Sequence, residues 1–400
     1  MTPALRILLV TFYYQPDLSA GSFRTAALVK ALLEHQSPRI SVDVLTTLPN
    51  RYRTFTQSAA EEEVGERLTV RRIRLPSHKS GMIDQARSFG HFARRASKLS
   101  RTGEYDLVVA TSGRLMTAAL GASIAKRVRA PLYLDIRDLF VDNLKYILPA
   151  PIVLPLQPVM SLLERWTFNS AAHINLVSKG FAPYFANRYP AKSLSWFTNG
   201  VDDEFLPESV PKAPARSGGL GGPIHILYAG NFGEAQGLHL IVPALAGRLG
   251  SRARFTLIGD GGRRPQLEQR IAEDGLTNVS VVRPMSRDAL IAEYAAADVL
   301  FLHLNDFDSF KTVLPSKIFE YAALGKPIWA GVAGYSAEFL RDEVPNVAVF
   351  DPCATDQAIS VLEDLEIADV PRSAFIEKFS RRTIMRQMAA DIVAHASKGR

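Results

Sequence analysis

The sequence is poor in the residues that build disulfides, metal clusters and membrane spans. Its 400 residues contain one cysteine, Cys353, which excludes an internal disulfide framework and a cysteine-based metal cluster. A single cysteine fits a reducing compartment. No run of about 18 apolar residues occurs, so we expect no transmembrane helix. The opening MTPALRILLVTFYY contains Arg6 and no small-residue cleavage pattern, and it predicts a buried strand rather than a signal peptide.

Several catalytic and binding signatures are also missing. The eight histidines show no metal-ligand spacing, and we interpret His303, beside Asp306 and Asp308, as a polar strand-end residue rather than a zinc ligand. The chain has no P-loop, no G-x-G-x-x-G fingerprint and no G-x-S-x-G nucleophile motif. No nucleic-acid-binding module stands out. We therefore expect no metal, no cofactor and no nucleic-acid partner.

Positive charge is in excess and unevenly spread. The formal net charge is +7 and the pI is about 9.4, which favours anionic partners. Residues 78–101 carry six Lys or Arg against one Asp, with apolar residues at helical spacing. This pattern predicts either an amphipathic helix at an anionic membrane surface or a core helix with a solvated basic face. The proline-rich YILPAPIVLPLQPV at 146–159 reads as a hydrophobic loop leading into a helix.

What is present is a strand–helix alternation that runs through the chain twice. Continuous apolar runs between helical patterns predict parallel strands buried on both faces. The first series begins at RILLVTF and the second at IHILYAGNFG, and a segment rich in Pro, Gly and Ser at 206–223 reads as a linker. We predict an α/β protein of two Rossmann-like, doubly wound domains facing each other across a cleft. A last helix follows residue 375.

Ligands of such sheets bind at the carboxyl ends of the strands, so the residues that follow strands are informative. Gly21 and Ser22 stand where the first loop becomes a helix, and small residues there let backbone N–H groups reach an anion, with Arg24 nearby to add charge. Asp135, Arg137 and Asp138 follow a buried strand in YLDIRDLF. A carboxylate there can act as a base, and Arg137 can steady a phosphate. An ordinary turn and a local ion pair are the alternatives.

The second series repeats this arrangement. Glycine-containing turns follow two strands, in NFGEAQGL and in DGGRRPQ, and they include Gly261 and Arg263. Further on, PSKIFEYAALGKP places Ser316, Lys317 and Glu320 at a helix start. A lysine there opposes the helix dipole, so an anion such as a diphosphate would justify it. Glu320 lies one turn on and can accept both hydroxyls of a ribose. The alternative is a capped surface helix with a Lys317–Glu320 pair.

Together these motifs resemble the GT-B glycosyltransferases of the retaining family 4 type. The resemblance covers nearly the whole chain and rests on QPDLSAGS, TNGVDDEF, YAGNFGEAQGL, LIGDG, AADVLFLHL and LPSKIFEYAALGKPIWAG. A finer resemblance is to bacterial fucosaminyltransferase-like enzymes of O-antigen and capsule assembly, which share RDLF, the GNxGxxQGL pattern and FKTVxPSKxFEYxAxGKP. It implies an acceptor domain at 1–205, a nucleotide-sugar donor domain at 206–375, and a terminal helix at 376–400 that packs back on the first domain.

The resemblance also implies roles for individual residues. Glu320 matches the second glutamate of the family's E-x7-E element and is expected at the ribose. The expected catalytic residues are Asp138, Arg137 and Lys317. The expected donor-binding residues are Gly21, Ser22, Asn231, Gln236, Gly261, Arg263, Lys311, Ser316, Lys317 and Glu320.

The chain departs from the broad family at three places. Thr312 stands at the position of the first glutamate. Asn231 and Gln236 replace an arginine and a lysine, for which Lys311, Lys317 and Arg263 are the plausible substitutes. Arg137 or Asp138 replaces the usual histidine of the first domain.

The implied activity is metal-independent transfer of an amino or deoxyamino sugar from a nucleotide diphosphate, UDP foremost, to a lipid-linked saccharide of O-antigen or capsule. The implied location is cytoplasmic, peripheral on the inner face of the plasma membrane and bound to its anionic surface. Two other functions fit the architecture: a sugar-nucleotide 2-epimerase, against which the lack of well-placed strand-end histidines argues, and a non-catalytic sugar-nucleotide-binding protein, for which the absent carboxylate at Thr312 argues.

Overall fold

The computed structural model describes residues 5–17, 19–36, 38–50, 58–76, 82–148, 150–211 and 222–397. Residues 78–81 of the basic stretch and 212–221 of the expected linker lie outside the described residues. Within the described ranges, no helix is both long enough and apolar enough to cross a bilayer. The chain forms two compact units, Met1–Thr198 with Arg382–Arg400, and Asn199–Arg381.

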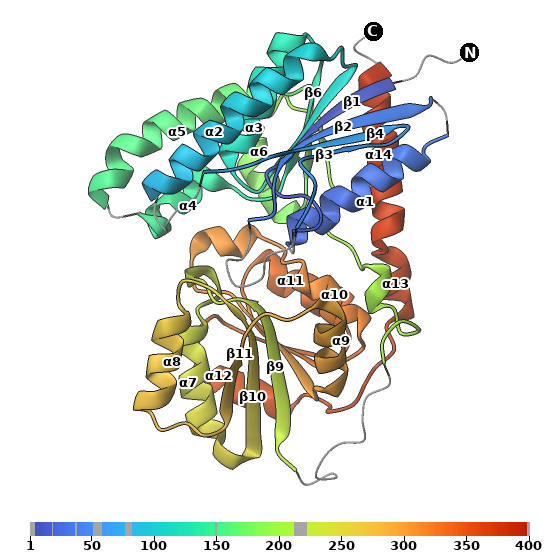
Figure 1. Ribbon diagram of the computed structural model, residues 1–400. Coiled ribbons are helices and arrows are strands. Elements are labelled where there is room, and N and C mark those ends of the chain that lie inside the picture. The colour runs from blue at the N-terminus through green and yellow to red at the C-terminus, as the bar shows by residue number, and fades with distance from the viewer. Residues whose placement is uncertain are drawn as a thin grey trace. The chain divides into compact units, whose positions relative to one another are not determined.

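The first unit is built on an eight-stranded sheet in the order β3-β4-β2-β1-β5-β6-β7-β8 (Figure 1). All its neighbouring strands run parallel except β3 and β4. Its strands are β1 (Leu5–Val10), β2 (Ile40–Thr47), β3 (Glu62–Val64), β4 (Leu68–Ile73), β5 (Leu107–Ser112), β6 (Leu132–Ile136), β7 (His173–Leu176) and β8 (Leu194–Ser195). Its helices are α1 (Ala20–Glu34), α2 (Met82–Leu99), α3 (Leu115–Val128), α4 (Phe140–Ile147), α5 (Ala150–Ser170), α6 (Ala182–Arg188) and the terminal α14 (Arg381–Ser397).

The second unit has a six-stranded, wholly parallel sheet in the order β11-β10-β9-β12-β13-β14. Its strands are β9 (Ile224–Asn231), β10 (Ala253–Asp260), β11 (Val279–Val282), β12 (Val299–His303), β13 (Ile328–Gly331) and β14 (Val347–Phe350). Its helices are α7 (Leu238–Leu249), α8 (Arg264–Glu273), α9 (Arg287–Ala296), α10 (Lys317–Ala323), α11 (Tyr335–Glu343), α12 (Thr355–Glu363) and α13 (Ser373–Lys378). The predicted fold class of two Rossmann-like α/β units is confirmed.

The strand order reverses once in each sheet, between β1 and β5 and between β9 and β12. Loops leave these strands in opposite directions at the reversal, which opens a crevice at their carboxyl ends. The central strands are mostly apolar, as expected where helices cover both faces of a sheet. Ile7, Leu8, Leu9 and Val10 of β1 are fully buried, as are Val299, Leu300 and Phe301 of β12.

The division between the units differs from the expected one at residue 205. The segment after Thr198 already belongs to the second unit, because the backbone N–H of Val201 donates to Phe379 O at 2.8 Å and Arg381 N–H donates to Val201 O at 2.9 Å. The outgoing chain thus runs beside the returning chain. The described ends of the expected linker, residues 206–211 and 222–223, belong to the second unit. Residues 382–397 return to the first unit, where Met388 and Ile392 are fully buried.

The proline-rich segment after Tyr146 is helical, contrary to the prediction of a loop. Helix α5 contains Pro155 and Pro158 in its interior. Both prolines lie on its exposed side. The carbonyls that lose their backbone donors there can bond to water instead, which lowers the cost of a proline inside a helix.

Candidate active site

The first group of candidate residues surrounds the N-terminus of α1 in the first unit. The helix begins after Ser19, whose Oγ accepts a hydrogen bond from the backbone N–H of Ser22 at 3.1 Å. That N–H is therefore already capped, and Ser22 itself is fully buried. Gly21 remains the better placed of the two expected backbone donors.

Arg137 lies directly over this helix start. A Cβ on Gly21 would come within 2.1 Å of Arg137 Nη1, and one on Gly113 would come within 3.9 Å of the same atom. The guanidinium thus lies against two glycines that follow β1 and β5, the strands at the reversal of the sheet. A side chain at position 21 would displace the Arg137 guanidinium from the helix start.

Asp138 follows Arg137 beyond the carboxyl end of β6. Its side chain keeps solvent-exposed surface, yet reduced solvation raises its pKa to about 6, while the Arg137 guanidinium opposes the rise. A carboxyl with a pKa near neutrality can both accept and release a proton at physiological pH. The structure thus brings Gly21, Arg137 and Asp138 to one edge of the first sheet.

Arg24 and Asp135 do not face a ligand, contrary to expectation. They form a two-bond ion pair, from Arg24 Nε to Asp135 Oδ2 at 2.8 Å and from Nη2 to Oδ1 at 2.9 Å, and both side chains are about 1% exposed. Asn175 donates to the same carboxylate at 2.7 Å. The pairing with Arg24 lowers the pKa of Asp135 in spite of its burial. This pair therefore joins α1 to β6 and is not available for chemistry.

In the second unit, two loops meet beyond the ends of β9 and β10. The backbone comes so close that a Cβ on Gly261 would lie 2.5 Å from Phe232 O. The side-chain amides of Asn231 and Gln236 bond to each other at 2.9 Å, and Gly233 N–H donates to Gln236 Oε1 at 3.3 Å. Asn231 and Gln236 therefore shape the turn that follows β9.

Arg263 and Lys311 are each paired with an acidic neighbour. Arg263 forms an ion pair with Glu234, and the ammonium of Lys311 lies 2.9 Å from Asp308 Oδ1. About half of the Lys311 side chain is exposed. Thr312 donates its hydroxyl to Ser309 O at 3.0 Å, so it closes a local turn where the family pattern has a carboxylate.

Lys317 opens α10 and crosses the end of β9. Its ammonium lies 5.7 Å from the ring centroid of Tyr228, and a Cβ on Gly230 would come within 2.3 Å of Lys317 Nζ. Gly230 has a φ of +151°, a conformation that only glycine adopts readily. Burial lowers the pKa of the Lys317 ammonium, and the nearby Glu320 carboxylate opposes that shift.

Glu320 shares this end of α10. Burial raises the pKa of its carboxyl, while the positive charges of Lys317, Arg287 and Arg381 oppose the rise. Ser316 is the N-cap residue, but its side chain makes no capping hydrogen bond. The helix ends as the sequence predicts, with Gly325 in the left-handed conformation at φ +73°.

Two further groups lie near these residues, and the first was not anticipated. Asp202, from the motif TNGVDDEF, accepts from Arg287 Nη2 at 2.7 Å and from Arg381 Nη2 at 3.2 Å. The two arginines that act on Glu320 are thus held by one carboxylate. Arg287 and Arg381 are 85 and 179 residues from Asp202, so no local pattern signals the cluster.

His303 is the second group. It is fully buried at the end of β12, where Nδ1 lies 2.7 Å from Gln236 O and Nε2 lies 3.0 Å from Cys353 N. Because Cys353 N–H is a donor and Gln236 O is an acceptor, the imidazole carries its proton on Nδ1. Both ring nitrogens are therefore occupied, which agrees with the prediction of a structural histidine and not a zinc ligand.

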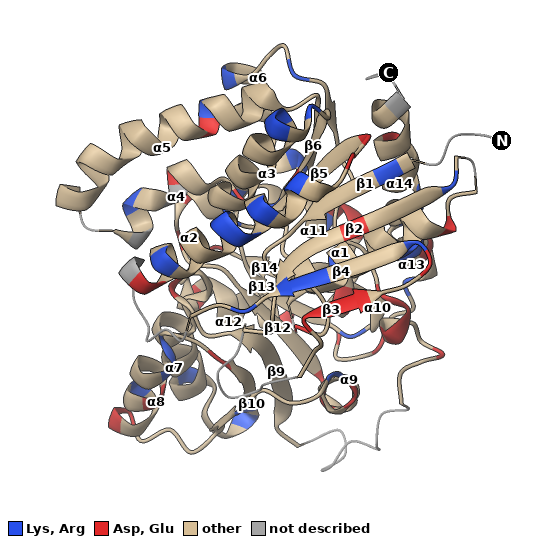
Figure 2. Cartoon of the chain, turned by 45° about the horizontal axis from the view of Figure 1, so that its top comes forward, with Lys and Arg blue, Asp and Glu red and all other residues tan. Residues whose placement is uncertain are grey.

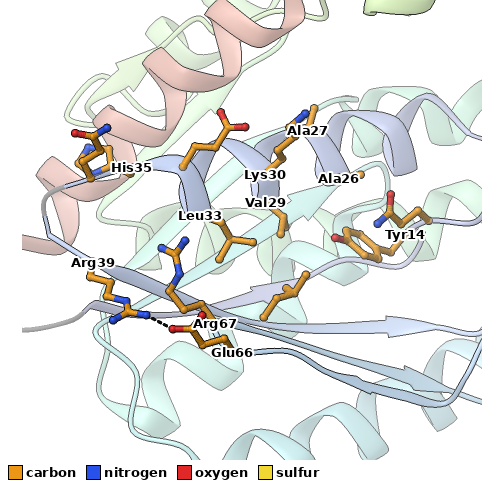
Figure 3. Close-up of a pocket in the computed structure, with 14 residues that line it drawn as sticks. Tyr14, Ala26, Ala27, Val29, Lys30, Leu33, His35, Arg39, Glu66 and Arg67 are labelled. Atoms are coloured by element: carbon orange, nitrogen blue, oxygen red, sulfur yellow. Dashed lines mark hydrogen bonds and ion pairs between the residues drawn. The ribbon is translucent and has the colours of Figure 1, made fainter.

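A cavity in the first unit lies apart from the predicted site residues. It has a volume of about 850 Å³ and is bounded by α1 on one side and by residues 66–68 on the other (Figure 3). Apolar side chains such as Val29 and Leu33 line it beside the paired Arg39 and Glu66. None of the predicted site residues borders it.

Comparison with known proteins identifies the family. Residues 22–194 match the glycosyl transferase 4-like domain, and residues 211–381 match the glycosyl transferases group 1 domain. The chain belongs to the GT-B glycosyltransferases. Each match falls within one of the two structural units of this glycosyltransferase.

Individual relatives are more distant. This glycosyltransferase is 29% identical over 170 residues to the colanic acid biosynthesis glycosyl transferase WcaI of Escherichia coli K12, covering 41% of this chain and 38% of WcaI. It is 28% identical over 264 residues to the 2-deoxystreptamine glucosyltransferase of Streptomyces kanamyceticus. This match covers 62% of this chain and 64% of the relative. The matches thus span less than two thirds of either relative.

Among solved structures, Anabaena HepE in complex with UDP and glucose has a TM-score of 0.65 to this chain. The two share 17% sequence identity, over 98% of this chain and all of HepE. At that identity the likeness supports the fold alone, and it agrees with the two-sheet architecture described above.

Proposed function

We propose that the protein transfers a sugar from a nucleotide-diphosphate donor to a lipid-linked saccharide in the assembly of a surface polysaccharide. The observation that carries this proposal is the pairing of Lys317 and Glu320 at the end of β9. Lys317 offers its ammonium to a leaving diphosphate, and Glu320 offers its carboxylate to a ribose. The family match supports the reaction class. The complex of HepE with UDP supports a uridine nucleotide, and the relative WcaI, named for colanic acid biosynthesis, supports the polysaccharide.

The residues divide the reaction between them. Lys317 places its positive charge where negative charge develops on the departing diphosphate, a form of electrostatic catalysis that needs no metal ion. In the first unit, Gly21 N–H and Arg137 offer positive potential to an anionic group of a substrate. Asp138 takes the proton from the acceptor hydroxyl. Following the resemblance to family 4, we propose an N-acetylated amino or deoxyamino sugar as donor and transfer with retention.

The test is a panel of UDP- and GDP-sugars with and without acceptors, read by mass spectrometry and by NMR of the anomeric proton. Transfer requires both partners, and an α-linked donor should give an α-linked product. Release of an epimerised sugar from the donor alone would establish a 2-epimerase instead. Binding without turnover under any acceptor, including an aminocyclitol, would establish a binding protein.

The Glu320→Ala variant tests the site directly. Loss of hydrogen bonds to a charged group costs about 1.5–3 kcal/mol, so calorimetry should show UDP binding weakened by roughly 10- to 100-fold. Glu338→Ala removes an exposed glutamate from α11 of the same unit and serves as the matched control. Equal affinities of the two variants would make Glu320 a structural residue.

We further propose attachment to an anionic membrane through the basic side chains of α2 and the apolar surface of α5. The apolar face of α2 is not free for lipid, because Phe92 is fully buried and its ring centroid lies 5.3 Å from that of Phe12. The basic side chains of α2 are exposed instead, and Figure 2 shows the basic positions along this helix in blue. The exposed apolar surface is on α5, where Leu154 is 74%, Val159 61% and Leu162 69% exposed.

Helix α3 packs against both α2 and α5, so the basic and apolar surfaces belong to one layer of the first unit. Arginines near an anionic surface contribute about 1 kcal/mol each. Flotation with vesicles of 30% phosphatidylglycerol should therefore show binding that weakens in high salt and in a triple Arg94, Arg95 and Lys98 to Gln variant. The exposed arginines of the second unit give a charge-matched control: Arg254, Arg270 and Arg283 to Gln. Equal vesicle binding by the two triple variants would show that the basic side chains of α2 do not contact the membrane.

A further inference from the structure

A cluster of two histidines and an aspartate lies in the first unit, away from the strand ends that carry the candidate site. His173 is the first residue of β7, whereas Arg137 and Asp138 follow the carboxyl end of the neighbouring strand β6. The cluster is therefore at the opposite edge of the sheet. Its other members, Asp391 and His395, stand four residues apart on α14, and that spacing puts both on one face of the helix.

We infer that His173, Asp391 and His395 form a binding site for a divalent transition metal ion of the zinc, cobalt or nickel kind. One potential ligand atom from each residue lies within 4.8 Å of the others. Two imidazole nitrogens with one carboxylate oxygen are a donor set that suits these borderline ions. This site goes beyond the proposed sugar transfer and takes no part in it.

The contacts around His173 show why a cation fits. Its Nε2 lies 3.3 Å from Asp391 Oδ2 and 3.0 Å from Ser195 Oγ, and its Nδ1 lies 3.0 Å from Ser193 Oγ. Ser195 donates its own hydroxyl to Asn175 Oδ1 at 3.3 Å, so without metal the proton between His173 and the Asp391 carboxylate is on Nε2. A metal ion can replace that proton when Nδ1 donates to Ser193 instead. The Nδ1 contact then orients the ligand, as is usual around metal-bound histidines.

Asp391 and His395 are also oriented. Tyr133, which is fully buried, donates its hydroxyl to Asp391 Oδ2 at 2.8 Å. His395 Nδ1 lies 2.8 Å from the carbonyl oxygen of Asp391. That carbonyl can only accept, so Nδ1 carries the proton and Nε2 keeps a lone pair for a metal. The Asp391 side chain is 24% exposed and that of His395 is 13% exposed, so an ion can enter from solvent.

Coordination requires one adjustment. The rings of His173 and His395 are stacked, with centroids 4.0 Å apart and planes inclined by 32°. Tetrahedral zinc with bonds of ~2.0 Å brings ligand atoms to roughly 3.3 Å from one another. This change requires rotation of the His395 side chain, the more exposed of the two rings, away from its Nδ1 contact with Asp391 O. The ion then fastens α14 to the edge of the first sheet.

The test is calorimetry with zinc chloride and cobalt chloride on the chelator-treated full chain, together with thermal unfolding and the visible spectrum of the cobalt form. We expect calorimetry to show one ion bound per chain and the melting temperature to rise by several degrees. The visible spectrum of the cobalt form should show the d–d bands of a four-coordinate site. Asp391→Asn and His395→Ala should weaken binding by at least about tenfold.

The control is His91→Ala, which removes an exposed imidazole from α2 of the same unit. It should bind metal as the parent does. Binding that is absent from the parent, or that is equally tight in Asp391→Asn and the parent, would overturn the site. Because none of these measurements uses a sugar nucleotide, their outcome is independent of the proposed transferase activity.

Discussion

The positions of Lys317 and Glu320 depend on residues that never touch a ligand. The ammonium lies over a glycine and an aromatic ring at the end of β9, and the carboxylate is balanced by arginines that Asp202 holds in place. Sequence reasoning found the pair itself, since residues at i and i+3 on a helix are neighbours. It missed Asp202, Arg287 and Arg381 because their contacts join distant parts of the chain.

A single methyl group at Gly230 tests this dependence. Gly230→Ala forces Lys317 Nζ to move, because the new Cβ would lie 2.3 Å from it. Turnover should fall by about 10²-fold, the loss expected when one charge-stabilising donor is misplaced, and UDP affinity should fall much less. Gly262→Ala is the control, since a Cβ there meets nothing within 4 Å. Equal rates for both variants would remove Lys317 from the mechanism.

Asp138 should set the acidic limb of the activity profile. A base must be ionised to accept a proton, so the rate should rise as pH increases through about 6, the pKa of this carboxyl. Asp138→Asn should abolish the limb and lower the rate by roughly 10²- to 10⁴-fold. Asp142→Asn, which alters a carboxylate that is 39% exposed and lies 3.4 Å from Arg188, should keep the limb. A limb that persists in Asp138→Asn would assign the proton transfer to another group.

His303 predicts how the second unit responds to acid. Burial lowers its pKa from 6.5 to about 4, so the folded unit binds fewer protons than the unfolded chain between those values. The resulting stabilisation, roughly 3 kcal/mol, is complete above pH 6.5 and is lost as pH falls to about 4.

This acid response can be followed through Trp329, whose ring lies 5.1 Å from that of Phe301 on β12. Urea unfolding monitored by its fluorescence, with Trp166 and Trp196 replaced by Phe, should show a smaller pH dependence in His303→Gln than in the parent. His91→Gln, which changes an exposed histidine of the other unit, should leave the dependence unaltered. An unchanged slope in His303→Gln would mean that other groups control it.

At the scale of elements, the buried Arg24–Asp135 pair joins α1 to β6 and stabilises the framework of the first unit. Removing one partner leaves an uncompensated charge in the core, so Asp135→Asn or Arg24→Met should lower the free energy of unfolding by about 3–5 kcal/mol. The exposed Arg39–Glu66 pair is the comparison, and Glu66→Gln should cost less than about 1 kcal/mol. Chemical denaturation of the variants measures both. If the variants of the buried pair lost as little free energy of unfolding as Glu66→Gln, water would have to reach the remaining partner of the Arg24–Asp135 pair.

Other elements mark where sequence patterns fail. The prolines of α5 suggested a loop, yet water can bond to the carbonyls they leave free on the exposed side. The basic amphipathic pattern of α2 fitted a membrane helix and a core helix equally well. Only the packing of Phe92 against Phe12, across 80 residues of sequence, distinguishes them. Periodicity reports that a helix has an apolar face, and not what covers that face.

At the scale of the whole molecule, the two series of buried strands were enough to predict two doubly wound units. The carboxyl ends of the strands then located most candidate residues. The boundary at Thr198 was not predictable, because it depends on hydrogen bonds between Val201 and the returning chain near residue 380. Contacts of that range leave no periodic signal in either segment.

The return of the chain to its first unit has a consequence during synthesis. The sheet of that unit is complete once Ser195 has left the ribosome, yet the helix that covers part of it is translated only after the entire second unit. While residues 199–381 are being synthesised, the first unit therefore lacks the helix that covers part of its sheet. A premature stop codon in the second half would damage the first half as well.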